Sequence, residues 1–497
     1  MQNSLNIAAV DLGSNSFRLQ VGRVVDEQVY AVDSLREPVR LAAGLSPDGY
    51  LDEASQARAV DALKRFAQRL RGFPRPAVRA VGTNTLRAAE NAADVLHRFE
   101  QALGFPIEVV GGREEARLIY LGVSHGLAPT AEKRLVVDIG GGSTEFIIGT
   151  DHAPRVTESL YMGCVSWSLR YFPDQRLSKS NMKQAVTAAR IEVETIRKQF
   201  ASKHWQEAIG SSGTARAIAD VLEACGWTQS GINRDGLERL RAAMIDAGHV
   251  ARISLAGLRG DRLPVLPGGV AIMKAVFDEL GVEEMKIASG AMRQGILWDM
   301  VGRTRRKDMR EMTVRQFMKR YHVDAEHAHR VERLAKRLYE QFADDDREQY
   351  GAQLLSWAAR LHEIGLSVAH GGFHKHSAYI LANADMPGFS RMEQQHTSIL
   401  VRSHRGSLEK LKGLVNDQAD WILLMTLRLA VLMYRSRSEV RLPRIRARKT
   451  GSSYIVDIDG RWLEAHPLTA AELQQEIAAW HRLGVELSVP RLAETTE

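Results

Sequence analysis

An internal repeat constrains the fold of this chain more than any other feature. The segment IAAVDLGSNSFRLQVGRV near the start aligns with RLVVDIGGGSTEFIIGTD from Arg134, so that Asp11 matches Asp138 and Gly13 matches Gly140. Each copy is an apolar run that ends in aspartate, then a turn of small residues, then a second run with alternating apolar positions. This pattern is typical of a β-hairpin. Two matched hairpins predict a duplicated βββαβα-type half.

Strands and helices alternate after each hairpin. We expect helices over residues 51–71, 91–103, 181–203 and 268–280, and strands over residues 78–81, 107–110, 156–160, 207–210 and 285–288. Such alternation indicates an α/β layer fold, so two similar lobes should enclose a cleft. Hydrophobic residues make up 44% of the chain, which agrees with a globular class rather than a disordered one.

The composition changes after about residue 302. Residues 303–320 hold eight basic side chains and two acidic ones, and the sequence beyond is helical in pattern until a strand expected over residues 454–458. We therefore expect lobe I at residues 1–125, lobe II at residues 126–302, and a basic linker with a mainly helical domain and a small terminal subdomain at residues 303–497.

A second basic run, residues 435–449, has seven basic side chains and one acid, Glu439. Such a run is either a solvated face or loop, or a track for a long polyanion. The net charge of +7 favours an anionic partner such as a phosphate chain, a nucleotide or nucleic acid.

Three turns of small residues are suited to phosphate binding: those of the two hairpins, and GSSGTA from Gly210 to Ala215. Their successive N–H groups and hydroxyls are donors for an anion, although glycine turns also serve tight hairpins alone. Arg87 follows a strand and either clamps a phosphate or forms a surface salt bridge. No GxxxxGK[ST] motif indicates a P-loop enzyme. With Arg87, the candidate substrate-binding residues are Ser14, Asn15, Ser16, Gly140, Gly141, Gly142, Ser143, Thr144, Ser212, Gly213 and Thr214.

Three carboxylates, Asp11, Asp138 and Glu145, lie at or beside the hairpin turns. Oxygen ligands near phosphate suit Mg²⁺, which keeps several waters and binds few protein groups. An aspartate that only caps its own turn is the alternative. Because the aspartate recurs at both turns, we favour a site for Mg²⁺ or another divalent cation.

Two further carboxylates, Glu114 and Glu115, open the helix GGREEARLIYLGV. Acidic residues in a first helical turn complement the helix dipole, which alone would explain one of them. A helix that starts at a strand edge of an α/β fold also points into the cleft, where a carboxylate can take a proton from an attacking water.

Seven motifs in order, VDLGSNS, GTNTLR, GREEARLIY, VVDIGGGSTE, MGCVSW, SSGTARA and SGAMRQG, span Val10 to Gly295. With them the chain closely resembles the family of exopolyphosphatases and guanosine pentaphosphate phosphohydrolases. The GGGS form of the second turn, residues 140–143, and the segment HKHSAYILANADMPGF at residues 374–389 favour the exopolyphosphatase branch.

The resemblance implies actin-like, ribonuclease H-like lobes. It matches Glu115 to the family's catalytic carboxylate, Arg87 and the glycine turns to phosphate binding, and Asp138 and Glu145 to positions near the metal. The C-terminal region resembles HD-type phosphohydrolase domains, with His362 and Glu363 in place of the expected His-Asp pair. We therefore interpret that domain as catalytically silent and its histidines as structural or anion-binding.

These features together predict an exopolyphosphatase that processively removes terminal phosphates from inorganic polyphosphate. Water attacks the terminal phosphorus in line, with Glu115 as general base. A guanosine pentaphosphate 5′-phosphohydrolase, a non-hydrolytic polyphosphate or nucleic-acid binder, and an ATP-driven kinase on the same fold are the alternatives. We expect a cytoplasmic protein without membrane insertion, because the start of the chain lacks a secretory pattern and Cys164 and Cys225 do not form a disulfide scaffold. We also expect a homodimer.

Overall fold

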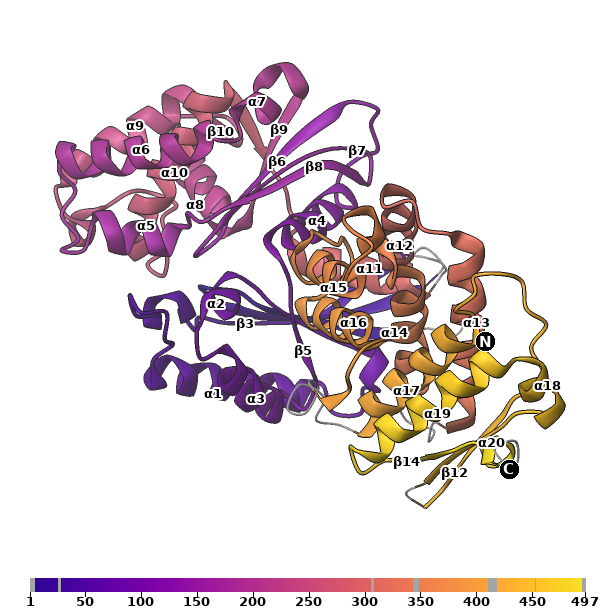
Figure 1. Cartoon of the computed structure of the whole chain (residues 1–497). Coiled ribbons are helices and arrows are strands. Elements are labelled where there is room, and N and C mark those ends of the chain that lie inside the picture. The colour runs from indigo at the N-terminus through magenta and orange to yellow at the C-terminus, as the bar shows by residue number, and fades with distance from the viewer. Residues whose placement is uncertain are drawn as a thin grey trace. The chain divides into compact units, whose positions relative to one another are not determined.

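The computed structural model describes residues 5–25, 28–304, 308–342, 348–409, 418–451 and 453–493. The chain separates into two compact units, Met1–Asp308 and Met309–Glu497 (Figure 1). The buried hydrophobic clusters follow this division: three lie within the first unit and one within the second.

The first lobe of the first unit is a five-stranded sheet in the order β3-β2-β1-β4-β5. Strands β1 and β2 form the first predicted hairpin, and β4 runs parallel to β1. Side chains alternate along β1, so that Ala8 and Val10 join one hydrophobic cluster while Ile7 and Ala9 join another on the opposite face. The strands are β1 Leu5–Leu12, β2 Phe17–Val25, β3 Gln28–Glu37, β4 Val78–Gly82 and β5 Ile107–Val109.

Helices cover both faces of this sheet, as the alternation of apolar side chains requires. The cluster that contains Ala8 and Val10 also contains Phe66 of α1 and Phe99 of α3. The cluster on the other face contains side chains of α4 and α11. The helices of this lobe are α1 Glu53–Arg69, α2 Asn84–Ala88, α3 Ala92–Leu103, α4 Gly112–Ser124 and α11 Met292–Thr304.

The second lobe repeats the arrangement with six strands in the order β10-β11-β9-β6-β7-β8. Strands β6 and β7 form the second predicted hairpin, and β9 runs parallel to β6 as β4 does to β1. The predicted duplication and actin-like α/β fold are therefore confirmed. The elements are β6 Lys133–Ile139, β7 Thr144–Thr150, β8 Ala153–Leu160, β9 Glu207–Ser211, β10 Ile232–Asn233, β11 Glu284–Ile287, α5 Cys164–Tyr171, α6 Lys179–Glu194, α7 Arg197–Phe200, α8 Ser212–Ala224, α9 Arg234–Ala247 and α10 Leu266–Leu280.

Helices α4 and α11 cross so closely that glycine is required at the crossing. A Cβ atom added to Gly295 would lie 1.7 Å from the carbonyl oxygen of Leu118, and one on Gly122 would lie 2.0 Å from that of Ala291. A buried ion pair joins the same helices, because Asp299 of α11 accepts from Arg117 of α4 at 2.5 Å. The start of α4, where Glu115 lies, is therefore held against a rigid partner.

The second unit is mainly helical, as predicted, and ends in a small mixed sheet in the order β12-β13-β14. Among the helices in the described part of the chain, we find none that is both long and apolar enough to cross a membrane. The elements are α12 Met309–Arg320, α13 Ala325–Phe342, α14 Glu348–Leu361, α15 Phe373–Asn383, α16 Arg391–Ser403, α17 Gln418–Met433, β12 Arg446–Thr450, β13 Ser453–Asp457, α18 Gly460–Ala465, α19 Pro467–His481, β14 Glu486–Ser488 and α20 Pro490–Ala493.

The two basic runs differ from a simple loop or linker. The end of the second run forms β12, in which Arg446 and Arg448 are exposed while Ala447 is buried and pairs with Val456 of β13. This strand was not expected, because its alternation spans only a few residues. Most of the first run belongs to α11 and α12, and residues 305–307 lie outside the described residues.

The glycine crossing gives a test of how α4 is held. We expect Gly295→Ala to destabilise the protein by about 1–3 kcal/mol, because the new methyl group overlaps a backbone oxygen that cannot move alone. Thermal or denaturant unfolding measures the change. Gly260→Ala is the matched control, since a Cβ there meets no atom within 4 Å, and it should change stability by less than about 0.5 kcal/mol. Equal effects of the two substitutions would contradict the close crossing.

Candidate functional site

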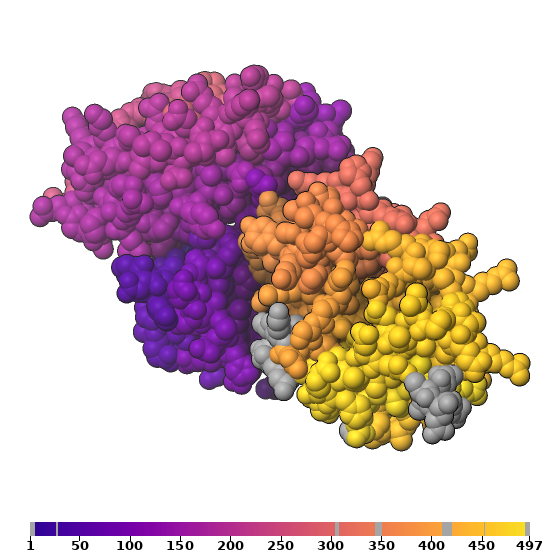
Figure 2. Space-filling view, viewed as in Figure 1, coloured from indigo at the N-terminus to yellow at the C-terminus, as the bar shows by residue number. Residues whose placement is uncertain are grey.

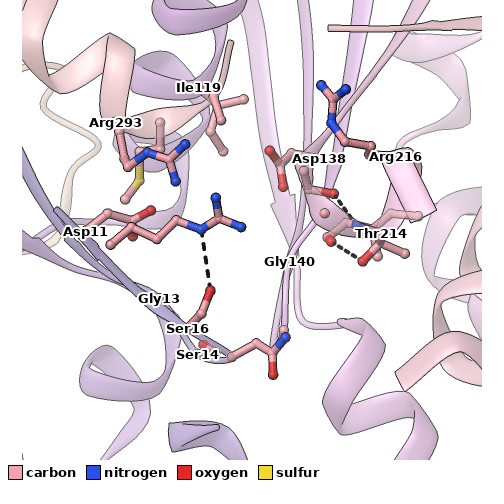
Figure 3. A pocket seen from close by; sticks show the side chains of 18 of the residues that line it. Asp11, Gly13, Ser14, Ser16, Ile119, Asp138, Gly140, Thr214, Arg216 and Arg293 are labelled. Atoms are coloured by element: carbon pink, nitrogen blue, oxygen red, sulfur yellow. Dashed lines mark hydrogen bonds between the residues drawn. The ribbon is translucent and has the colours of Figure 1, made fainter. Parts of the chain in front are cut away.

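A cavity of about 360 Å³ in the first unit is lined by residues of both lobes. Figure 2 shows the surface hollowed between the indigo and magenta parts of this unit. Figure 3 shows Asp11 and Arg293 on one side of the cavity, and Asp138, Thr214 and Arg216 on the other. The repeated hairpins therefore place their matched aspartates across one cavity.

The turns of the two hairpins lie against each other at this cavity. A Cβ atom added to Gly141 would lie 3.0 Å from Cβ of Ser14 and 3.1 Å from the backbone nitrogen of Asn15. The third turn joins them where α8 begins, since the hydroxyl of Thr214 donates to the carbonyl oxygen of Ile139 at 2.9 Å. The small residues thus allow three backbone turns to approach a single space, the geometry that an anion needs.

The structure brings most of the predicted site residues to the cavity wall. Thr144 is not among them, because its hydroxyl donates to the carbonyl oxygen of Met162 at 2.6 Å. Gly142 faces Asn84, whose Nδ2 would lie 2.2 Å from an added Cβ. Arg87 and Glu145 lie behind the wall. The predicted residues that line the cavity are Asp11, Ser14, Asn15, Ser16, Glu115, Asp138, Gly140, Gly141, Ser143, Ser212, Gly213 and Thr214.

Four carboxylates at or near the cavity affect one another, and all except the partly exposed Asp11 are buried. Burial raises the pKa of Asp11 to about 6, and burial together with the neighbouring Asp11 raises the pKa of Asp138 to about 6. Burial also raises the pKa of Glu115 to about 7. The pKa of Glu145 is raised well above its ordinary value by burial and then by Glu115 and Asp138. Carboxylates clustered in this way ionise more readily when a positive charge lies nearby.

The two adjacent glutamates of α4 have different surroundings. Glu114 forms a bidentate ion pair with Arg117, both contacts at 2.8 Å. Glu115 lines the cavity, and its Oε2 accepts from Nη1 of Arg87 at 3.2 Å. Arg87 also donates to the carbonyl oxygen of Val110 at 2.8 Å, which fixes its position. Only Glu115 of this pair is placed to meet a molecule in the cavity.

The donor set fits Mg²⁺ but does not form a closed cage. In the part of the chain that the structure describes, three ligand atoms lie within 4.8 Å of one another only at His327, His362 and Glu363, in the second unit. Asp11 and Asp138 are oxygen donors whose raised pKa values a cation would lower. Mg²⁺ suits such a place, because it takes one or two carboxylates and completes its shell with water and phosphate oxygens. Glu145 instead accepts from the hydroxyl of Ser159 at 2.9 Å.

Arginines of the cavity were missed by sequence reasoning. Arg262 is only 5% exposed and its guanidinium lies over Gly213, where an added Cβ would meet Nη2 at 2.0 Å. Burial and then Arg36 lower the pKa of Arg262, as expected for cations gathered without enough acid. The motifs SSGTARA and SGAMRQG contained two of these residues. Within the described residues the arginines of the wall are Arg18, Arg36, Arg216, Arg259, Arg262 and Arg293.

Solved structures support the fold of the first unit. An exopolyphosphatase from Cytophaga hutchinsonii aligns with 60% of this chain and 98% of its own, with a TM-score of 0.54 and 22% identity. The structure of an exopolyphosphatase-like protein aligns with 60% of this chain and 99% of its own, with a TM-score of 0.53 and 22% identity. At this identity the likeness shows the fold alone.

Sequence relatives overturn the predicted branch. A protein of Vibrio parahaemolyticus is 37% identical over 486 residues, which cover 97% of each chain, and one of Aeromonas hydrophila is 36% identical over 490 residues, which cover 97% of this chain and 98% of its own. Both are named guanosine-5′-triphosphate,3′-diphosphate pyrophosphatase. The expectation of an exopolyphosphatase is therefore wrong. The GGGS turn misled it, because a turn that holds a terminal phosphate serves either substrate.

Two family descriptions together match nearly the whole chain. The Ppx/GppA phosphatase family matches residues 20–304, and Ppx/GppA phosphatase, domain III, matches residues 309–477. The matches adjoin close to the division between the two compact units. On this agreement of sequence and structure, the chain belongs to the Ppx/GppA phosphatase family of phosphoanhydride hydrolases.

Proposed function

We propose that the chain hydrolyses the terminal 5′ phosphoanhydride bond of guanosine 5′-triphosphate 3′-diphosphate. The products are orthophosphate and guanosine 5′-diphosphate 3′-diphosphate. The observation that carries the proposal is the match over 97% of the chain to relatives named for this nucleotide.

The charge of the cavity supports a substrate with two separate phosphate groups. The glycine turns and the carboxylates suit one terminal phosphate with its metal ion. The arginines of the wall offer more positive charge than that phosphate needs. Arg36 pairs with Asp261 at 2.8 Å, which leaves Arg259 and Arg262 for a second phosphate group. Arginine binds phosphate bidentately, so these side chains suit the 3′-diphosphate.

The chemistry that we propose needs no covalent enzyme intermediate. A water oxygen forms a bond to the terminal phosphorus while the bond from that phosphorus to the bridging oxygen breaks, and the proton of the water passes to Glu115. Arg87 holds the Glu115 carboxylate in place and favours its ionised form. Mg²⁺ held beside Asp11 and Asp138 would supply charge stabilisation to the phosphate oxygens.

Phosphate release in water enriched in ¹⁸O tests this proposal. With the full chain and Mg²⁺, we expect guanosine 5′-triphosphate 3′-diphosphate to yield orthophosphate that carries the ¹⁸O, because water attacks the terminal phosphorus. A chelator should stop the reaction, and no second nucleotide should be needed. Label in the nucleotide product would contradict the bond assignment. Faster phosphate release from polyphosphate than from the nucleotide would contradict the substrate.

The adjacent glutamates give a matched pair of variants. We expect Glu115→Gln to lower kcat by about 10²- to 10⁴-fold with little change in melting temperature, because it removes the proton acceptor and keeps the shape. Glu114→Gln should lower the melting temperature and leave kcat nearly unchanged, since it weakens a buried ion pair with Arg117 and does not alter the cavity. Steady-state kinetics and thermal unfolding measure both. A near wild-type kcat for Glu115→Gln would reject its role as base.

The raised pKa of Glu115 predicts a pH dependence. A base with a pKa of about 7 is mostly protonated below that pH, so kcat/KM should fall as the pH drops below about 7. Arg87 lowers the pKa of Glu115, so Arg87→Gln should move this fall to a higher pH. Arg113→Gln is the control, because Arg113 lies on the same helix as Glu115 but pairs with Glu158 at the surface. A fall at the same pH in all three proteins would show that another group titrates.

A further inference from the structure

Buried histidines gather in the second unit. His327 lies in α13, His362 directly follows α14, and His404 directly follows α16 (Figure 1). Their exposed fractions are 2%, 1% and 2%. The ring centroid of His362 lies 5.8 Å from that of His327 and 5.0 Å from that of His404. Helix α14 packs against both α13 and α16, so three elements bring these rings together.

Two of these imidazoles have their protonation fixed by backbone carbonyls. Nδ1 of His362 lies 2.6 Å from the carbonyl oxygen of Ala359, and Nδ1 of His404 lies 2.6 Å from that of Val401. A carbonyl oxygen only accepts, so each Nδ1 carries the hydrogen and each Nε2 keeps its lone pair. This is the arrangement in which histidine binds a metal ion.

The free lone pairs lack partners in the protein. Neither Nε2 of His362 nor Nε2 of His404 has a hydrogen-bond partner among the described residues, and the same holds for Nδ1 of His327. A buried polar atom without a partner destabilises the fold, because it loses water and gains nothing in exchange. Several such atoms in one cluster indicate a ligand that accepts electron pairs.

A carboxylate completes the donor set. Oε1 of Glu363 lies 3.8 Å from Nε2 of His327 and 3.8 Å from Nε2 of His362, both too far for a hydrogen bond. One donor atom of each residue lies within 4.8 Å of the other two. Tetrahedral bonds of roughly 2.0–2.2 Å would place ligand atoms about 3.4 Å apart. The two contacts to Glu363 would shorten by a few tenths of an ångström, and the donor nitrogens of His327 and His362, which lie within 4.8 Å of each other, would also move closer.

Arg437 is the cation that already contacts this site. It donates to Oε1 of Glu363 from a half-exposed position after α17. Its contact accounts for the carboxylate, but not for Nε2 of His362, which lies beside that carboxylate and has no partner among the described residues. A metal ion would accept electron pairs from all of these groups, whereas a guanidinium serves only one of them here.

We propose that the second unit binds one divalent transition-metal ion of the zinc class through His327, His362 and Glu363. Two nitrogens and one carboxylate oxygen are a donor set that zinc favours and that magnesium does not. The proposal stands on this cluster alone and does not depend on the function of the cavity. Since the ligands come from separate helices, the bound ion would tie α13 to the end of α14.

Metal binding by the full chain tests the proposal. After removal of metals, zinc is titrated against a competing indicator dye in excess Mg²⁺, which occupies oxygen sites elsewhere. We expect about one zinc per chain, and at least a tenfold loss of affinity in His327→Gln and in His362→Gln, because each removes a ligand. His329→Gln is the matched control on α13, since His329 is exposed and pairs with Glu332. It should bind as the wild type does.

Two further measurements keep the test decisive. Arg437→Gln should bind zinc more tightly than the wild type, because it removes the competing cation from Glu363. Cobalt bound to the wild type should give the visible absorption of a four-coordinate site. This absorption reports the coordination geometry even if a histidine variant fails to fold. Wild-type binding no tighter than that of the double variant His327→Gln, His362→Gln would overturn the proposal. Zinc binding by Arg437→Gln alone would also overturn it, since Arg437 would then be the resident cation.

Discussion

The repulsion among buried carboxylates is the interaction on which the cavity depends. Asp11, Asp138, Glu115 and Glu145 are largely withdrawn from water, and the pKa of each is raised by burial. They can be ionised together only where positive charge lies close by. Arg87 supplies it for Glu115, and Arg293 and Arg18 supply part of it for Asp11. The same charge that balances the carboxylates also neutralises a phosphate, so one arrangement serves both the folded protein and its chemistry.

The position of Glu115 shows how distant parts of the chain decide a local role. Glu114 and Glu115 are equivalent in sequence, since both lie in the first turn of α4. The difference comes from Arg117, which binds Glu114 and also Asp299 of α11. This network directs one carboxylate into the protein and leaves the next one at the cavity wall. The spacing of residues within α4 could not have shown it, because the deciding partner is far away in the chain.

The parts of the structure that the sequence predicted are those set by short-range pattern. The matched hairpins and their aspartates follow from local alternation, and the sheets confirm them. Arg259 and Arg262 come from an irregular segment without periodicity, so nothing in the pattern placed them at the cavity. Strand β12 was hidden in a basic run because its alternation is short. The substrate was misjudged for a chemical reason: glycine turns that suit a terminal phosphate carry no information about the rest of the molecule that bears it.

The two units offer different donor atoms to an ion. The cavity of the first unit offers buried oxygens, which suit a hard cation that keeps its waters. The second unit offers neutral imidazoles with free lone pairs, which suit a softer ion. Arginine has a different role in each: Arg87 favours the ionised form of a carboxylate, whereas Arg437 competes with an ion for one. Because ligand type differs between the two units, an ion at the proposed histidine site would stabilise the helices of the second unit without exchanging with a magnesium ion beside Asp11 and Asp138.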